Sequence, residues 1–273
     1  MSELKLFTNP RIELVGRPHM DVVAVSRFLE EHGLEWPELE KQLSLYGRDA
    51  EWLIEEAGRG CYVSWPKEGE EPKGRSHDDH IKHLIEVQHG ACIEHANFNF
   101  MVWGVSRTLT HELVRHRIAS YSQLSQRYVD SSDCAFVVPP GIQEIKDTKP
   151  HIYDVWLKHC QDSQELYKTL TAELSEMYQD IESKLERRKK ARQAARSVLP
   201  GCTETKIFVT MNARAIRHFC ELRANPAADL EIRKLAVAMF DIMSERFPLI
   251  VHGMKKVELE DGTFGVESEF RKV

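Results

Sequence analysis

The sequence predicts an α+β fold in which a twisted central β-sheet is flanked by long helices. Segments 97–102 and 206–211 alternate apolar and polar side chains, which is typical of strands with one buried face. Residues 150–186 carry apolar side chains at spacings of three and four, the period of an amphipathic helix. With 273 residues, of which 42% are hydrophobic, the chain can enclose a sizeable core. We therefore expect residues 1–273 to form a single domain.

The N-terminal part combines a short strand, helical patches and a polar loop. Residues 11–15 alternate and predict a strand, whereas residues 26–60 favour helices that are interrupted by Gly and Pro. Residues 64–76 mix charged side chains with further Gly and Pro, which indicates a surface loop. We interpret residues 26–76 together as an insertion that could act as a lid.

Five histidines stand between residues 77 and 95, and they allow two interpretations. The cluster from His77 to His83 includes Asp78 and Asp79, and His with Asp is a ligand set that metal-dependent phosphohydrolases use. Against a metal site, apolar residues within 81–88 recur with the period of a helix packed against a core. We favour the packed helix and predict no metal site.

Residues 106–116 predict a helix with three functional candidates on its polar side. Ser106 is suited to cap the N-terminus of this helix. Glu112 precedes Arg115 by three residues and His116 by four, so the three side chains can meet on one face. A surface ion pair is the alternative.

The stretch Arg115–Tyr128, RHRIASYSQLSQRY, is dense in hydrogen-bonding side chains and contains three arginines. Guanidinium groups this close repel one another unless an anion or a carboxylate lies between them, and they bind phosphate or a heterocycle edge in two-pronged fashion. The interleaved serines suit a phosphate cradle. We interpret the stretch as a binding site rather than a solvated loop, with Ser125 as a binding residue, because no base partner for a serine nucleophile is visible.

A strand, an apolar stripe and a basic segment follow. Residues 134–138 predict a buried strand that ends at two prolines. Residues 184–196 carry seven basic side chains against one acidic one, and Arg192 and Arg196 lie on the Ala-rich side, where they could reach an anion. The apolar stripe predicts packing, for which another subunit is one candidate, and it consists of Leu166, Leu170, Leu174, Met177, Ile181 and Leu185.

The C-terminal part predicts two more helices and a tail. Asn212 is placed to cap a helix over 212–223, in which Arg214 and His218 share one face. Residues 229–247 follow as an amphipathic helix with Ile232, Leu235, Met239 and Met243 inward, and residues 258–273 predict an irregular tail.

Two of these stretches resemble the motifs of the flavin-dependent thymidylate synthases, the ThyX family. The family signature is RHR, then Ser, then Ser-x-Arg-Tyr, and it stands here as Arg115-His116-Arg117, Ser120 and Ser125-Gln126-Arg127-Tyr128. The triplet Asn212–Arg214 and the closing Leu222-Arg223-Ala224 resemble a second family motif. The resemblance covers residues 77–250 as a family core. It implies a ThyX-type fold, a single catalytic domain, and a homotetramer with active sites at subunit interfaces.

The resemblance also implies the residues of the site. Arg223 would be the catalytic residue, because a guanidinium on the uracil edge stabilises negative charge that develops on the ring. The implied dUMP-binding residues are Glu112, Leu113, Val114, Arg115, Gln123, Leu124, Ser125, Gln126, Arg127, Arg196 and Arg223. The implied FAD-binding residues are His89, Ala91, Arg115, His116, Arg117, Gln123, Asn212, Ala213, Arg214 and His218.

By the same resemblance, the reaction is the reductive methylation of dUMP to dTMP. The carbon donor would be 5,10-methylenetetrahydrofolate, the reductant of FAD would be NADPH, and no cysteine nucleophile would be needed. The chain departs from the family pattern at Glu112, where many relatives have Gln, at Ser122-Gln123, where Asn-Glu is frequent, at Ala91, where Thr or Ser is frequent, and at Ala227, where a His is usual. The rival hypotheses are the phosphohydrolase at His77–His83 and an RNA-binding module built on residues 184–196 and Arg115–Arg127.

Composition limits the class of protein. The net charge of −6 argues against general nucleic-acid binding, and no run of eighteen apolar residues predicts a membrane span. The six cysteines form no CxxC pair, and the N-terminus carries no secretory pattern, so we expect reduced thiols and a cytoplasmic protein.

Overall fold

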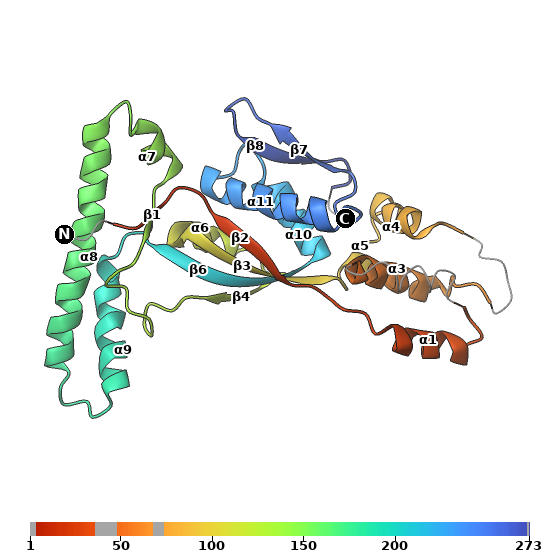
Figure 1. Cartoon of the computed structure of the whole chain (residues 1–273), viewed down its shortest axis with the longest axis horizontal. Coiled ribbons are helices and arrows are strands. Elements are labelled where there is room, and N and C mark those ends of the chain that lie inside the picture. The colour runs from red at the N-terminus through yellow and green to blue at the C-terminus, as the bar shows by residue number, and fades with distance from the viewer. Residues whose placement is uncertain (1–3, 36–47, 68–73, 272) are drawn as a thin grey trace.

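A computed structural model describes residues 4–35, 48–67, 74–271 and 273, and a four-stranded sheet lies at its centre (Figure 1). The strand order is β2-β3-β6-β4, and all neighbouring strands are antiparallel. The predicted strands at 11–15, 97–102 and 206–211 are confirmed and extended, and β4 had not been predicted. The strands are β2 (Arg11–Gly16), β3 (Asn97–Ser106), β4 (Ser120–Gln123) and β6 (Glu204–Asn212).

Helices cover one face of this sheet. Phe98 and Phe100 of β3 are 0% exposed and belong to the same core cluster as residues of α6 (Arg107–Leu113), α10 (Ala213–Arg223) and α11 (Leu230–Arg246). On the opposite face Met101 pairs with Phe208, and these side chains remain 50% and 38% exposed. The alternation predicted for this segment therefore separates the core face from an open apolar face.

The two longest basic and apolar helical segments do not flank the sheet, as the sequence had suggested. Helices α8 (Pro150–Met177) and α9 (Lys184–Ala195), followed by η1 (Arg196–Val198), pack mainly on one another and form an arm at one end of the sheet (Figure 1). The single helix expected over 150–186 is interrupted because Ser183 caps a new helix at the backbone N–H of Glu186. Part of the apolar stripe stays exposed, since Leu166, Met177 and Leu185 are 47%, 62% and 53% exposed.

The N-terminal helices are α1 (Val22–Glu31), α3 (Asp49–Tyr62), α4 (His77–Glu86) and α5 (Gly90–Ile93). Helix α3 is part of the core rather than a lid over it, because Ala50 and Ile54 join the central cluster. Buried Glu51 accepts a hydrogen bond from the backbone N–H of Leu249 at 3.2 Å, which ties α3 to the loop after α11. Of the predicted loop 64–76, residues 68–73 lie outside the described residues. The helix expected over 77–95 is divided at Gln88, whose φ of +61° ends α4.

Short elements complete the fold. The strand predicted at 134–138 shrinks to β5 (Phe136–Val137), which pairs with β1 (Leu6–Phe7), and α7 (Pro140–Ile145) follows. The tail expected to be irregular is instead a hairpin of β7 (Met254–Glu258) and β8 (Phe264–Ser268). Its connection contains Gly262 at φ +73°, a conformation that favours glycine and that permits the turn. Among the described helices, none is sufficiently long and apolar to cross a membrane.

Candidate active site

The structure brings the signature motif and the second motif to one cavity of about 660 Å³. Seven predicted site residues line it: Arg115, His116, Arg117, Asn212, Arg214, His218 and Arg223. The remaining lining residues, which sequence reasoning did not single out as site residues, are Ile118, Ala215, Arg217, Glu221, Leu222 and Val273. Two segments about a hundred residues apart in sequence, one after α6 and one in α10, therefore share a site with a cationic and an apolar part.

A buried tyrosine holds the loop that carries the RHR triplet. Helix α6 ends at Leu113, and β4 begins at Ser120. Between them, the hydroxyl of Tyr121 lies 2.8 Å from both the Leu113 and the His116 carbonyl oxygens and hydrogen-bonds to them. Burial raises the pKa of Tyr121 to about 12, so the hydroxyl keeps its proton and remains a donor. The tight loop turns Arg115 and Arg117 toward the cavity that they line.

Arg223 is held by two side chains of the signature region. Its Nη1 donates to Oε2 of Glu112 at 2.7 Å, and its Nε donates to Nε2 of His116 at 3.0 Å. The expected meeting of Glu112 and His116 is therefore made through Arg223 rather than through Arg115. Because Nε2 accepts a hydrogen bond, His116 is neutral in this arrangement. Burial, reinforced by the charge of Arg223 and by His218, lowers the pKa of His116 to about 4.

Helix α10 presents the second motif as predicted. The side chain of Asn212 accepts from the backbone N–H of Ala215 at 2.8 Å and caps the helix. Ile216, Phe219 and Cys220 are 0% exposed in the core, which leaves His218 and Arg214 on the cavity side. Arg214 makes an ion pair with Glu94 at 2.6 Å.

The other predicted residues do not line this cavity. Gln123 uses its Nε2 to bind Thr110 and Thr205 at 3.0 and 3.3 Å, which holds β4 onto α6 and β6. Leu124, Ser125, Gln126 and Arg127 continue past the end of β4, and Arg196 lies in η1 on the arm. His89 and Ala91 flank the turn into α5, where the ring of His89 stacks on Tyr62 at 6.1 Å. Leu113 is buried, Val114 is 40% exposed, and buried Ala213 opens α10.

Sequence reasoning missed Arg107, which lies near Arg196. Burial, followed by the charge of Arg196, lowers the pKa of Arg107, so the two guanidiniums are close enough to repel. In the described part of the chain neither makes an ion pair with a carboxylate. We call Arg107 and Arg196 the basic pair. An anion between them would relieve the repulsion. No spacing in the sequence relates the two positions, so only the fold reveals the pair.

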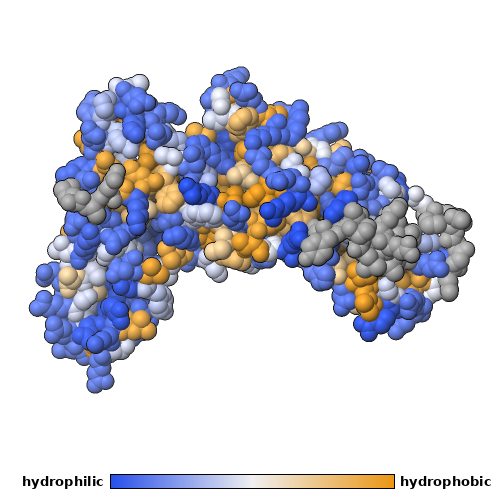
Figure 2. All heavy atoms as spheres, in the orientation of Figure 1, coloured by the Kyte–Doolittle hydropathy of each residue, from blue (hydrophilic) through white to orange (hydrophobic). Residues whose placement is uncertain are grey.

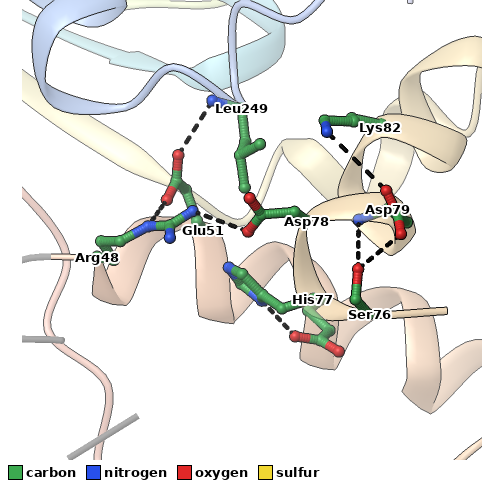
Figure 3. Close-up of polar contacts among 9 residues, drawn as sticks. Arg48, Glu51, Ser76, His77, Asp78, Asp79, Lys82 and Leu249 are labelled. Atoms are coloured by element: carbon green, nitrogen blue, oxygen red, sulfur yellow. Dashed lines mark hydrogen bonds and ion pairs between the residues drawn. The ribbon is translucent and has the colours of Figure 1, made fainter. Parts of the chain in front are cut away.

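The histidine cluster of α4 is engaged in structural contacts (Figure 3). His77 Nδ1 lies 2.5 Å from Oε2 of buried Glu55, and Asp78 pairs with Arg48 at 3.4 Å. Asp79 accepts from the Ser76 hydroxyl at 2.8 Å as part of the N-terminal cap. The described residues contain no group of three or more His, Cys, Asp or Glu that could hold a metal ion. The phosphohydrolase hypothesis therefore finds no support.

Comparison with known proteins agrees with the two motifs. The model of the thymidylate synthase complementing protein family matches residues 42–249, so the match begins well before residue 77. A flavin-dependent thymidylate synthase of Mycobacterium avium is 45% identical over 211 residues, which cover 77% of this chain and 82% of the relative. This chain belongs to the flavin-dependent thymidylate synthase family. The family's enzyme from Corynebacterium diphtheriae is 39% identical over 251 residues, covering 92% of this chain and 95% of that relative.

A solved structure shares the fold of this family member. The UMP/dUMP methylase PolB from Streptomyces cacaoi, bound with 5-Br UMP, matches with a TM-score of 0.61 at 22% identity, over 91% of this chain and 95% of that one. The same methylase bound with 5-Br dUMP matches with a TM-score of 0.60. These similarities describe the fold.

The donor set of the cavity fits the flavin that the family name implies. Arg115, Arg117 and Arg214 offer guanidiniums for a diphosphate, and Ile118 and Leu222 offer apolar surface for an aromatic ring system. None of the described residues that line the cavity is a cysteine or an acidic residue other than Glu221. The site is therefore suited to an anionic aromatic cofactor.

Proposed function

We propose that this protein is a thymidylate synthase that methylates dUMP to dTMP with FAD as its cofactor. The carbon would come from 5,10-methylenetetrahydrofolate, and NADPH would reduce the flavin. The observation that carries the proposal is the position of Arg223, which lies in one cavity with the RHR triplet and is oriented by Glu112 and His116. FAD, when bound, supplies the hydride chemistry, while the residues of the chain bind and orient the reactants.

Arg223 is the residue to which we assign the pyrimidine. A guanidinium beside N3 and a carbonyl oxygen stabilises the negative charge that develops there as C5 becomes nucleophilic. Its side chain is only 23% exposed, so the interaction is less screened than at a protein surface. The pair with Glu112 and the contact to neutral His116 fix the direction of the guanidinium before the substrate arrives, which lowers the cost of ordering it.

The phosphate of dUMP is assigned to a second group of residues. Arg196 and Arg107 form the basic pair, and Ser125 with the backbone of Arg127 adds hydrogen-bonding groups in the signature. Binding energy from this remote phosphate would position C5 and C6 of the ring. Cys61, Cys92, Cys134, Cys160, Cys202 and Cys220 are all free thiols outside the lining of the cavity, which suits a reaction without a cysteine nucleophile.

We infer that the active site is completed by other copies of the chain in a homotetramer. The basic pair and the Ser125–Arg127 turn do not line the cavity that holds Arg223, although one nucleotide should touch both groups. Apolar side chains on the arm and on the open face of the sheet are available for packing between copies. Figure 2 shows such hydrophobic surface over the central sheet and between the sheet and the arm.

The visible absorption spectrum of the purified protein, recorded before and after addition of dUMP, tests the proposed function. We expect an oxidised-flavin spectrum that dUMP shifts in the wild type and in the control Arg27→Lys, whose residue is exposed on α1. Arg223→Lys should keep the flavin spectrum and lose most of the dUMP-induced shift. A protein that stays colourless in the presence of added FAD would contradict the proposal.

Subunit complementation tests the shared site. Arg223→Ala and Arg196→Ala should each be inactive alone, because each removes one half of every site. Mixing the two variants under conditions of subunit exchange should restore part of the activity, since some sites then combine two intact halves. Mixed oligomers that form but remain inactive would show that one chain supplies both residues.

A further inference from the structure

The C-terminal end of the chain forms part of the cavity wall. Val273 is only 5% exposed and lines the cavity with Arg214 and Arg223. Figure 1 shows the C-terminus next to α5, on the side of the sheet that carries α10 and α11. We call residues 268–271 and Val273 the C-terminal segment. The sequence had predicted an irregular tail here, so its place in the site was unexpected.

Two arginines of α10 hold the C-terminal segment from one side. Arg217 is 1% exposed and donates to the carbonyl oxygens of Ile250 and His252 at 2.9 Å and of Phe270 at 3.1 Å. Arg214, three residues earlier on the helix, donates from Nε to the Val273 carbonyl oxygen at 2.8 Å. The segment is thus bound by charge-assisted hydrogen bonds to the helix that carries the second motif.

The turn into α5 holds the same segment from the other side. Gln88 lies 3.5 Å from the Arg271 carbonyl oxygen through its Nε2. A Cβ atom at Gly90 would stand 2.7 Å from the Val273 carbonyl carbon and 2.8 Å from Cζ of Arg214. Only glycine leaves room for the segment and the guanidinium together. Gly90 lies between His89 and Ala91, two residues predicted to contact FAD.

Glu94 completes the environment of Arg214. Its Oε1 accepts from Nη1 of Arg214 at 2.6 Å, while Nε is occupied by Val273. Among the described residues, no acceptor is recorded for Nη2 of Arg214. A long side chain with several rotamers is thereby fixed at two of its three nitrogens, and the third is free to bind an anion in the cavity.

We propose that Glu94 and the C-terminal segment are positioning elements for the flavin, because they hold the Arg214 guanidinium in place to bind an anionic group of that cofactor. The inference rests on the proposed function, since it assigns the cavity to FAD. It adds that the segment is a fixed wall of the site, clamped between α10 and the α5 turn. The segment and the cofactor should therefore bind with positive coupling rather than compete for Arg214.

The test compares FAD dissociation constants of four variants, measured by titration of flavin absorbance, with the melting temperature of each apoprotein. Glu94→Ala should raise the dissociation constant about tenfold, the loss expected for one charge-assisted hydrogen bond, and Glu94→Gln should recover part of it because it keeps an acceptor. Gly90→Ala should weaken FAD binding further by displacing Val273 and Arg214. Glu267→Ala is the matched control, because its exposed ion pair with Lys255 lies on the same hairpin away from the cavity.

Each outcome separates the hypotheses. Lower melting temperatures with unchanged FAD affinity in both Glu94 variants would mean that the contact is structural only and would overturn the inference. Tighter FAD binding by Glu94→Ala or Gly90→Ala would mean that the segment competes with the cofactor, which also overturns it. A wild-type protein that binds no FAD would overturn the proposed function as well. If Gly90→Ala does not fold, the Glu94 pair still decides.

Discussion

Replacing Glu112 by alanine should weaken dUMP binding through Arg223. The carboxylate and the guanidinium are joined by a hydrogen bond of 2.7 Å, and their side chains are 34% and 23% exposed. A charge-assisted hydrogen bond contributes about 1.5–3 kcal/mol when buried, and an exposed ion pair contributes up to about 1 kcal/mol. At this intermediate exposure we expect a loss of about 1–2 kcal/mol, which corresponds to a factor of roughly 5–30 in the dissociation constant.

Isothermal titration of flavin-loaded protein with dUMP measures this loss, and a double-mutant cycle assigns it. Glu112→Gln keeps an acceptor for Arg223 and should cost less than Glu112→Ala. In an Arg223→Lys background, Glu112→Ala should have little further effect, because the guanidinium that the carboxylate orients is already absent. An equal loss in both backgrounds would refute the reasoning, since Glu112 would then act on dUMP independently of Arg223.

Three further predictions concern His116, Arg217 and Arg107. The pKa of His116 is lowered from 6.5 to about 4, so the folded state binds fewer protons than the unfolded state between these values. Stability should therefore fall as the pH drops from 6.5 toward 4, and urea titrations of His116→Gln should show a shallower fall. Arg217→Ala leaves three carbonyl oxygens without their donor and should lower the free energy of unfolding by about 3 kcal/mol; a loss below about 1 kcal/mol in urea denaturation would contradict this. Arg107→Gln should weaken binding of dUMP about tenfold and leave binding of deoxyuridine unchanged, because only the nucleotide carries the phosphate. An equal loss for both ligands would place Arg107 elsewhere in the site.

Local patterns predicted the elements that position the site. Alternation located β3 and β6, and the cap residues Ser106 and Asn212 located the starts of α6 and α10. These succeeded because capping and strand alternation depend on neighbours in sequence. The break between α8 and α9 and the C-terminal hairpin were missed. A short helix cap and a glycine turn within charged sequence give weak signals against a strong apolar period.

The sequence by itself determined the chemistry of this protein. The spacing of the RHR signature and of Asn212–Arg223 identified the family and most of the residues that line the cavity. Only the tertiary structure decided which partners these side chains take. Arg223 meets Glu112 and His116, Arg107 meets Arg196, and Val273 meets Arg214 across separations of between 59 and 111 residues for the hydrogen-bonded pairs. Such contacts have no local signal, because packing of the sheet and of α10, rather than spacing along the chain, brings the partners together.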